Sequence, residues 1–150
     1  MNLASSSTDT VEQETLSNCC NSKVDVHTHI MPAPGAFYEP WKATPGEWIT
    51  LDKNDDDGAV NMMSYEIGRP PKLFRPVLAN LYDVNERLQD MNRDGVQTQV
   101  LSVPPAMWRY DLNDPDLALQ WCTSVNRYLA DVAAKNPDRF VALGIVPLQY

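Results

Sequence analysis

Two histidines separated by one residue are the side chains of this sequence best suited to chemistry. His27 and His29 are the only histidines among the 150 residues, and Asp25 precedes them at the same spacing. On an extended strand, positions i and i+2 point to the same face and lie roughly 6.6 Å apart. Two imidazoles held in this way can bind one ion, since a zinc–nitrogen bond is about 2.0–2.1 Å long. The spacing therefore predicts that His27 and His29 are metal ligands.

Further residues are needed to complete such a site. A catalytic zinc ion normally takes three protein ligands and a water molecule, and the chain has no third histidine. The other ligands would be Asp, Glu or Cys side chains, or residues beyond position 150. Cys19 and Cys20 precede the histidines, but their spacing does not match a zinc knuckle. The alternative for each histidine is a structural role, in which a buried imidazole satisfies a hydrogen bond in the core.

The residues around the histidines predict a strand that positions them. Residues 23–30 alternate in character, which is the period of a β-strand. The turn-forming residues 31–35 end this strand. The expected faces are Val24, Val26, Thr28 and Ile30 on one side, and Asp25, His27 and His29 on the other.

The rest of the chain predicts an insertion followed by two helix–strand units. Residues 47–51 are expected to form a short strand, and 59–67 and 72–78 a hairpin across 68–71. Asp83 with Glu86 predicts a helix start, and Gly95 predicts its end. Strands are expected at 96–103 and 140–146. A helix is expected over 115–135, with an apolar stripe of Ala118, Trp121, Cys122, Val125, Tyr128, Leu129 and Val132.

This order of elements predicts an α/β fold, namely a partial (β/α)8 TIM-type barrel. It would contain about three strands and two helices, with a hairpin insertion after the first strand. Each strand–helix–strand crossover implies parallel pairing and a right-handed connection. An open doubly wound sheet is the alternative, but no glycine-rich phosphate loop follows the first strand. In a barrel, the histidines would lie toward the C-terminal end of the first strand, where active sites are built.

Composition limits the partners and the domain organisation. Residues 1–22 are rich in Ser, Thr, Asn and Glu, and are expected to form a disordered tail before a single unit at 23–150. A net charge of −8 argues against nucleic acid and anionic membranes as partners. No apolar run approaches the roughly 20 residues of a membrane span, and no signal peptide is evident. Three cysteines form no disulfide framework, so we expect a cytoplasmic protein.

Five segments together resemble the amidohydrolase-like, metal-dependent decarboxylases. They are residues 24–32 (Val-Asp-Val-His-Thr-His-Ile-Met-Pro), 72–75, 87–96, 100–105 and 136–144, in the family's order and spacing. The pair Phe74-Arg75 and residues 102–108 favour the aminocarboxymuconate-semialdehyde decarboxylases over the salicylate- or resorcylate-type enzymes. The resemblance covers residues 23–150 and implies a (β/α)8 barrel of more than twice this length.

The resemblance also implies roles for three residues. His27 and His29 match the first two ligands of a metal that is typically zinc. Arg75 matches the arginine that binds a carboxylate of a small-molecule substrate, whereas an ordinary hairpin arginine is solvated or salt-bridged. The family's later histidine ligand, its general-base histidine and its late aspartate have no counterparts here, so the catalytic residues are not identified.

Two interpretations of this sequence remain open. In the first it is the N-terminal part of such an enzyme, inactive alone and part of a possible homodimer at full length. The enzyme could also be another aromatic acid decarboxylase or a hydrolase of the same superfamily. In the second it is a noncatalytic interaction fragment, because three parallel strands leave unpaired edges that invite association.

Overall fold

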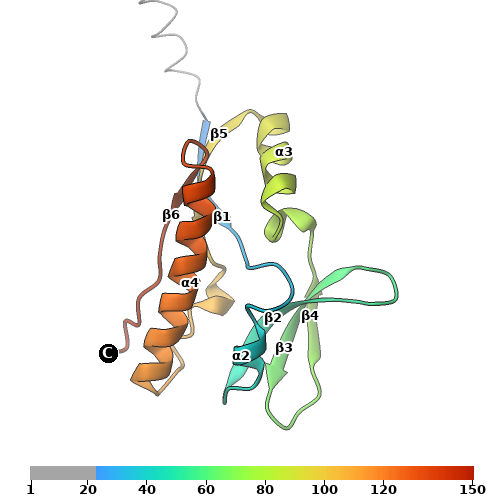
Figure 1. The fold of residues 1–150 in the computed structure, drawn as a ribbon, viewed down its shortest axis with the longest axis vertical. Helices are drawn as coiled ribbons and strands as arrows, with labels where there is room; N and C mark the ends of the chain where they lie inside the picture. Colours follow the sequence, from blue (N-terminus) through green and yellow to red (C-terminus); the bar gives the residue numbers. More distant parts are fainter. Residues whose placement is uncertain (1–22) are drawn as a thin grey trace, which may run out of the picture.

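Two three-stranded sheets organise residues 23–150, the part of the chain that the computed structural model describes (Figure 1). One sheet is parallel with the order β1-β5-β6, and the other is antiparallel with the order β2-β3-β4. The expected tail at 1–22, with Cys19 and Cys20, lies outside the described residues. The elements in chain order are β1 Lys23–His29, α2 Glu39–Lys42, β2 Glu47–Lys53, β3 Val60–Glu66, β4 Lys72–Pro76, η1 Ala79–Leu81, α3 Val84–Asp94, β5 Val96–Ser102, η2 Pro105–Met107, α4 Pro115–Lys135 and β6 Phe140–Ala142.

The parallel sheet confirms the predicted α/β fold. β1 pairs with β5, and β5 pairs with β6, so strands that are distant in sequence are neighbours in space. The helix α3 precedes β5 and packs against it, while α4 precedes β6 and packs against that strand. This succession of strand and helix is the repeating unit of a parallel α/β sheet.

Capping residues explain where both long helices begin and end. The Asp83 carboxylate accepts hydrogen bonds from the backbone N–H groups of Asn85 and Glu86 at the start of α3. Asp114 does the same for the first turn of α4, with Pro115 as its first residue. Gly95 ends α3 with a φ of 68°, a conformation that glycine adopts without a steric penalty. Both predicted helices are confirmed at these boundaries.

The strand predicted at 140–146 is shorter in the structure, because β6 ends at Ala142. One more ladder bond follows, from the Leu143 N–H to the Leu101 carbonyl, at 2.8 Å. The backbone of Ile145 then bonds to the side chain of Asn126 on α4, which accepts from its N–H at 2.7 Å and donates to its carbonyl at 2.8 Å. Because the N–H and carbonyl groups of Ile145 are bonded to Asn126, they cannot also bond to β5, and β6 ends before this residue.

The expected apolar face of β1 is only half correct. Thr28 and Ile30 are buried, but Val24 and Val26 are 53% and 72% exposed. Helices α3 and α4 pack on β5 and β6, and β1 lies at the edge of the sheet. Within the described residues, the first half of β1 therefore lacks a covering helix.

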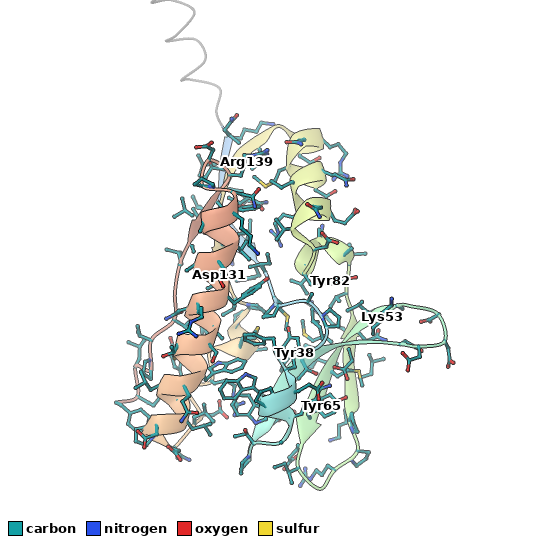
Figure 2. All side chains as sticks on the ribbon, in the orientation of Figure 1. Tyr38, Lys53, Tyr65, Tyr82, Asp131 and Arg139 are labelled. Carbon is teal, nitrogen blue, oxygen red and sulfur yellow. The ribbon has the colours of Figure 1, made fainter. Side chains whose placement is uncertain are left out.

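The insertion forms a complete antiparallel sheet, beyond the short strand and hairpin that were predicted. β2 pairs with β3 over seven residues, and β3 pairs with β4 across the predicted turn. The one-turn helix α2 was not predicted. Trp41 of α2 and Trp48 of β2 pack on Trp121 of α4, with ring centroids 4.8 Å and 5.1 Å from it. Tyr38 also lies between α4 and this sheet (Figure 2).

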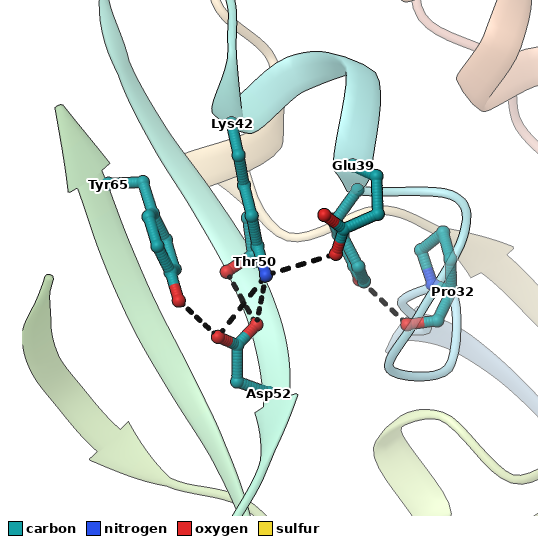
Figure 3. Close-up of polar contacts among 7 residues, drawn as sticks. Pro32, Glu39, Lys42, Thr50, Asp52 and Tyr65 are labelled. Atoms are coloured by element: carbon teal, nitrogen blue, oxygen red, sulfur yellow. Dashed lines mark hydrogen bonds and ion pairs between the residues drawn. The ribbon is translucent and has the colours of Figure 1, made fainter. Parts of the chain in front are cut away.

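A polar cluster fastens α2 to the antiparallel sheet (Figure 3). Asp52 on β2 accepts hydrogen bonds from the hydroxyls of Tyr65 and Thr50, the latter at 3.2 Å. Lys42 at the end of α2 lies 3.2 Å from the Asp52 carboxylate and 3.3 Å from that of Glu39. Its ammonium also lies 4.6 Å from the centre of the Tyr65 ring, which is a cation–π contact.

Two further sequence expectations concern single features. Cys122 is 4% exposed in the apolar stripe of α4, and burial raises the pKa of its thiol, which confirms a core role. Among residues 23–150, no helix combines the length and the apolar character that crossing a membrane requires.

Candidate metal and substrate site

The two histidines lie close together near the C-terminal end of β1. Their ring centroids are 5.2 Å apart and the ring planes are nearly perpendicular, at 85°. His27 is exposed and His29 is half-buried. The register between β1 and β5 shifts by one residue between Asp25 and Thr28, a stretch that includes His27. The Asp25 carboxylate accepts a hydrogen bond from the backbone N–H of His27 at this irregularity, at 3.2 Å.

Contacts from β5 and α3 hold His29 in place. Its Nδ1 atom lies 3.1 Å from the Oγ atom of Ser102, the residue directly opposite on β5. Its backbone carbonyl accepts a hydrogen bond from the guanidinium of Arg87 on α3. Burial lowers the pKa of His29, and the charges of His27 and Arg87 lower it further. The neutral imidazole, which is the form that binds metal ions, is therefore favoured.

Arg87 and Ser102 both contact His29, but the sequence analysis assigned neither of them to the candidate site. Arg87 lies on α3, is only 7% exposed and also donates to the Gln99 side chain at 3.0 Å. Burial is the main reason that the pKa of Arg87 is lowered. Ser102 belongs to a segment noted for its resemblance to the decarboxylases. Ser102 lies at the end of β5, the strand that pairs with β1. This position was the signal that could have placed Ser102 near the histidines.

The side chains present fit part of a metal site. The imidazoles of His27 and His29 on one strand offer nitrogen atoms of the kind that zinc takes as ligands. Within residues 23–150, no group of three or more His, Cys, Asp or Glu side chains is arranged to hold a metal ion. Among the described residues, His27 and His29 are the candidate ligands, and their metal role stays a prediction.

Arg75 lies on β4, opposite Met62 of β3, and is exposed. None of the ion pairs among the described residues involves its guanidinium. The antiparallel sheet that includes β4 lies beyond the C-terminal end of β1 (Figure 1). The insertion and the two histidines therefore share one end of the parallel sheet.

Two clefts of the described residues lie away from the histidines. One runs between α2 and α4 and is lined by Phe37, Trp41 and Leu117, among others. The other lies beside Arg109 and the start of α4, near Asp111 and Asp114. Neither cleft is lined by a histidine, whereas His27 is exposed and His29 is half-buried near the end of β1.

A parallel strand–helix sheet with a His-x-His pair at the end of its first strand is typical of the amidohydrolase-like decarboxylases. Comparison with known proteins supports this class. The chain is 36% identical over 127 residues to a 2-amino-3-carboxymuconate-6-semialdehyde decarboxylase of Dictyostelium discoideum, covering 85% of this chain and 33% of that protein. It is 35% identical over 126 residues to the Caenorhabditis elegans protein of the same name, covering 84% and 29%. The chain is a homologue of these decarboxylases, which confirms the resemblance seen in its sequence.

Solved structures give the same fold. The chain aligns with the apo form of Metarhizium anisopliae IDCase at a TM-score of 0.61 and 17% identity, covering 88% of this chain and 36% of that one. It aligns with a 2,6-dihydroxybenzoate decarboxylase from Rhizobium at a TM-score of 0.52 and 24% identity, covering 86% and 31%. No family model matches the sequence. The chain spans about a third of the length of the curated relatives that it matches.

Proposed function

We propose that this chain supplies the first metal-binding strand of a decarboxylase acting on 2-amino-3-carboxymuconate 6-semialdehyde. This reaction belongs to the kynurenine branch of tryptophan catabolism and limits the formation of quinolinate. The observation that carries the proposal is the histidine pair at the end of β1, with ring centroids 5.2 Å apart. The support from relatives is 36% identity to a decarboxylase named for this substrate.

The proposed metal is zinc, held by the imidazoles of His27 and His29 together with ligands outside this pair. A related fold, the dihydroxybenzoic acid decarboxylase from Polaromonas, contains bound manganese, so manganese is the alternative. When bound, such an ion acts as a Lewis acid that polarises the substrate. The contribution of this chain is to present two imidazoles on one strand, where Ser102 and Arg87 hold His29 in place.

The proposed role of Arg75 is to bind a substrate carboxylate. A guanidinium presents a planar fork of N–H donors that can hold a carboxylate through two parallel hydrogen bonds. The Arg75 side chain is exposed and outside the ion pairs of the described residues, so no internal carboxylate competes for it. Lysine would keep the charge at this position but would lose the fork.

The test of Arg75 is made in a full-length enzyme that contains this sequence. We expect Arg75→Lys and Arg75→Ala both to lower kcat/KM, by about 2–4 kcal/mol of transition-state stabilisation, as for other removed donors. Zinc content, measured by atomic absorption, should stay the same because Arg75 is not a ligand. Arg69→Ala is the matched control, since Arg69 lies in the exposed turn of the same hairpin and pairs with Glu66. Near-normal kcat/KM in both Arg75 variants would contradict the substrate role.

Residues 1–150 alone should not turn over 2-amino-3-carboxymuconate 6-semialdehyde. The reason is that two histidines cannot form a complete catalytic metal site, and the described residues contain no third ligand arranged with them. The measurement is the loss of substrate absorbance with purified chain and added zinc, beside a His27→Ala control. Turnover above this control would show that the missing ligands are dispensable.

The second candidate is a noncatalytic interaction fragment, favoured by the exposed strands at both edges of the parallel sheet. Sequencing the transcript past the codon of Tyr150 separates the two. An open frame that continues to a later histidine and a late aspartate supports the enzyme. A stop codon supports the fragment. Turnover of a dihydroxybenzoate in place of the semialdehyde would instead indicate another aromatic acid decarboxylase.

A further inference from the structure

The hydroxyl of Ser102 is placed between two groups of β1. Its Oγ atom lies 3.1 Å from Nδ1 of His29 and 3.3 Å from the backbone carbonyl of Thr28. This placement follows from the register, in which Ser102 pairs with His29, the residue after Thr28. The next backbone bond, from the Ile30 N–H to the Ser102 carbonyl at 2.9 Å, keeps the two strands aligned at this point.

The roles of donor and acceptor follow from the number of protons available. A hydroxyl has one proton to donate, and the carbonyl of Thr28 can only accept one. When the Ser102 hydroxyl donates to Thr28, only its lone pairs remain to face His29. The Nδ1 atom of His29 must then be the donor. A neutral imidazole has one N–H, so the lone pair is on Nε2.

We infer that Ser102 is a positioning residue that holds His29 as the Nδ1–H tautomer and leaves Nε2 free to bind the metal. This inference rests on the proposed metal role of His29. To that proposal it adds the ligating atom, Nε2 of His29, and the residue that selects this atom, Ser102. A hydrogen bond to the second ring nitrogen commonly fixes the tautomer and orientation of a metal-binding histidine. His27 differs, because no side chain among residues 23–150 forms a hydrogen bond with its ring.

The tautomer is measured directly by NMR on the chain labelled with nitrogen-15 histidine. Only two histidines are present, so four ring nitrogens give the complete spectrum, and a His27→Gln variant assigns them. The pH is set about two units above the ordinary histidine pKa of about 6.5. Because the pKa of His29 is lowered, its ring is neutral there. We expect His29 to carry its proton on Nδ1. In Ser102→Ala this preference should disappear, and in Ser102→Thr, which keeps the hydroxyl, it should return.

Thr28→Val is the matched control for these variants. It removes a neighbouring buried hydroxyl that donates to the Val100 carbonyl at 3.0 Å, but it keeps the Thr28 carbonyl that Ser102 uses. The Nδ1–H tautomer should therefore persist in Thr28→Val. A His29 proton on Nε2 in the unmodified chain, or an unchanged tautomer in Ser102→Ala, would overturn the inference.

Zinc titration of the same samples tests the metal role separately. We expect zinc to shift Nε2 of His29 while Nδ1 stays protonated, and Ser102→Ala to weaken zinc binding by roughly 10–100-fold. A zinc-induced shift at Nδ1 of His29 would overturn the inference but leave the metal role standing. Zinc that shifts none of the four ring nitrogens would overturn the metal role, and with it the basis of the inference.

Discussion

At the scale of single residues, Arg109 shows how the structure accommodates a buried charge. Its side chain is 5% exposed and its guanidinium lies 3.9 Å from the centre of the Trp48 ring. It donates two hydrogen bonds to the carboxylate of Asp111, from Nε at 2.9 Å and from Nη2 at 3.0 Å. Arg109 has a positive φ of 55°, which is uncommon for a residue with a side chain. The stacking and the paired hydrogen bonds offset that backbone cost.

Removing the partner of Arg109 should destabilise the protein at neutral pH. We expect Asp111→Ala to lower the free energy of unfolding by about 1–2 kcal/mol, because hydrogen bonds to a buried charged group are lost. The loss should be modest because the Asp111 side chain is 66% exposed, so solvent screens the interaction. Urea denaturation measures the change. Asp138→Ala, at an exposed position, is the control and should change stability by less than about 0.5 kcal/mol.

The same pair predicts the pH dependence of this effect. The hydrogen bonds from Arg109 lower the pKa of Asp111 in the folded protein. A lowered pKa means that the folded state favours the ionised carboxylate, so the stabilisation is present above the unfolded pKa of about 3.9. It is lost as the pH falls through the lower folded pKa. The difference between unmodified chain and Asp111→Ala should therefore shrink at acidic pH, and a constant difference would contradict the pairing.

At the scale of elements, the polar cluster around Asp52 joins a one-turn helix to a sheet. The carboxylate bonds to two hydroxyls of the sheet and to Lys42 of α2 (Figure 3). Burial and the hydrogen bond to Asp52 raise the pKa of Tyr65, so its phenol stays protonated as a donor at neutral pH. A helix of four residues is too short to be stable by itself. Its position therefore depends on this cluster and on the packing of Trp41.

Asp52→Ala should loosen the contact between α2 and the antiparallel sheet. Three polar groups would lose their shared partner in a partly buried place, at a cost of about 1–3 kcal/mol. Urea denaturation gives the global change, and hydrogen exchange at the amides of β2 and β3 gives the local one. Asp55→Ala, in the exposed turn after β2, is the matched control. If the two variants lose equal stability and exchange alike, the cluster does not hold α2.

At the scale of the whole molecule, the parallel sheet has apolar residues on surfaces that nothing in residues 23–150 covers. Val141 and Leu143 at the β6 edge are 49% and 52% exposed, and Val24 and Val26 at the β1 edge are more so. Parallel sheets are normally covered on both faces. Exposed strand edges can also pair with another chain. Residues 23–150 therefore have both features that promote self-association.

We expect the purified chain to self-associate with increasing concentration, and Val141→Lys to reduce this association. The added charge on an edge strand opposes pairing between copies, and its effect on the folded monomer should be small because Val141 is half exposed. Sedimentation velocity over a range of concentrations measures the change. Leu119→Lys adds the same charge at an exposed position of α4 and serves as the control. If Val141→Lys and Leu119→Lys associate to the same extent, the β6 edge does not take part in self-association.

The sequence by itself determined the features that depend on local chemistry. Period-two and helical patterns predicted β1, β5, α3 and α4, because side-chain alternation and capping residues act within a few positions of the chain. The spacing of His27 and His29 was enough to bring their rings near each other, because one strand contains both. The resemblance to decarboxylases was also visible in the sequence, and the homologues confirm it.

Only the tertiary structure decided the features that depend on contacts between distant segments. Trp41 and Trp48 had no periodic pattern in sequence, yet they form a core with Trp121, because α4 covers the insertion. The contact of Ser102 with His29 depends on the register between β1 and β5, across 73 residues of chain. Val24 is exposed because no helix of the described residues covers that part of β1. β6 ends early because the Asn126 side chain bonds to the backbone of Ile145. Such pairings are set by the balance of packing over the whole molecule, which no local pattern contains.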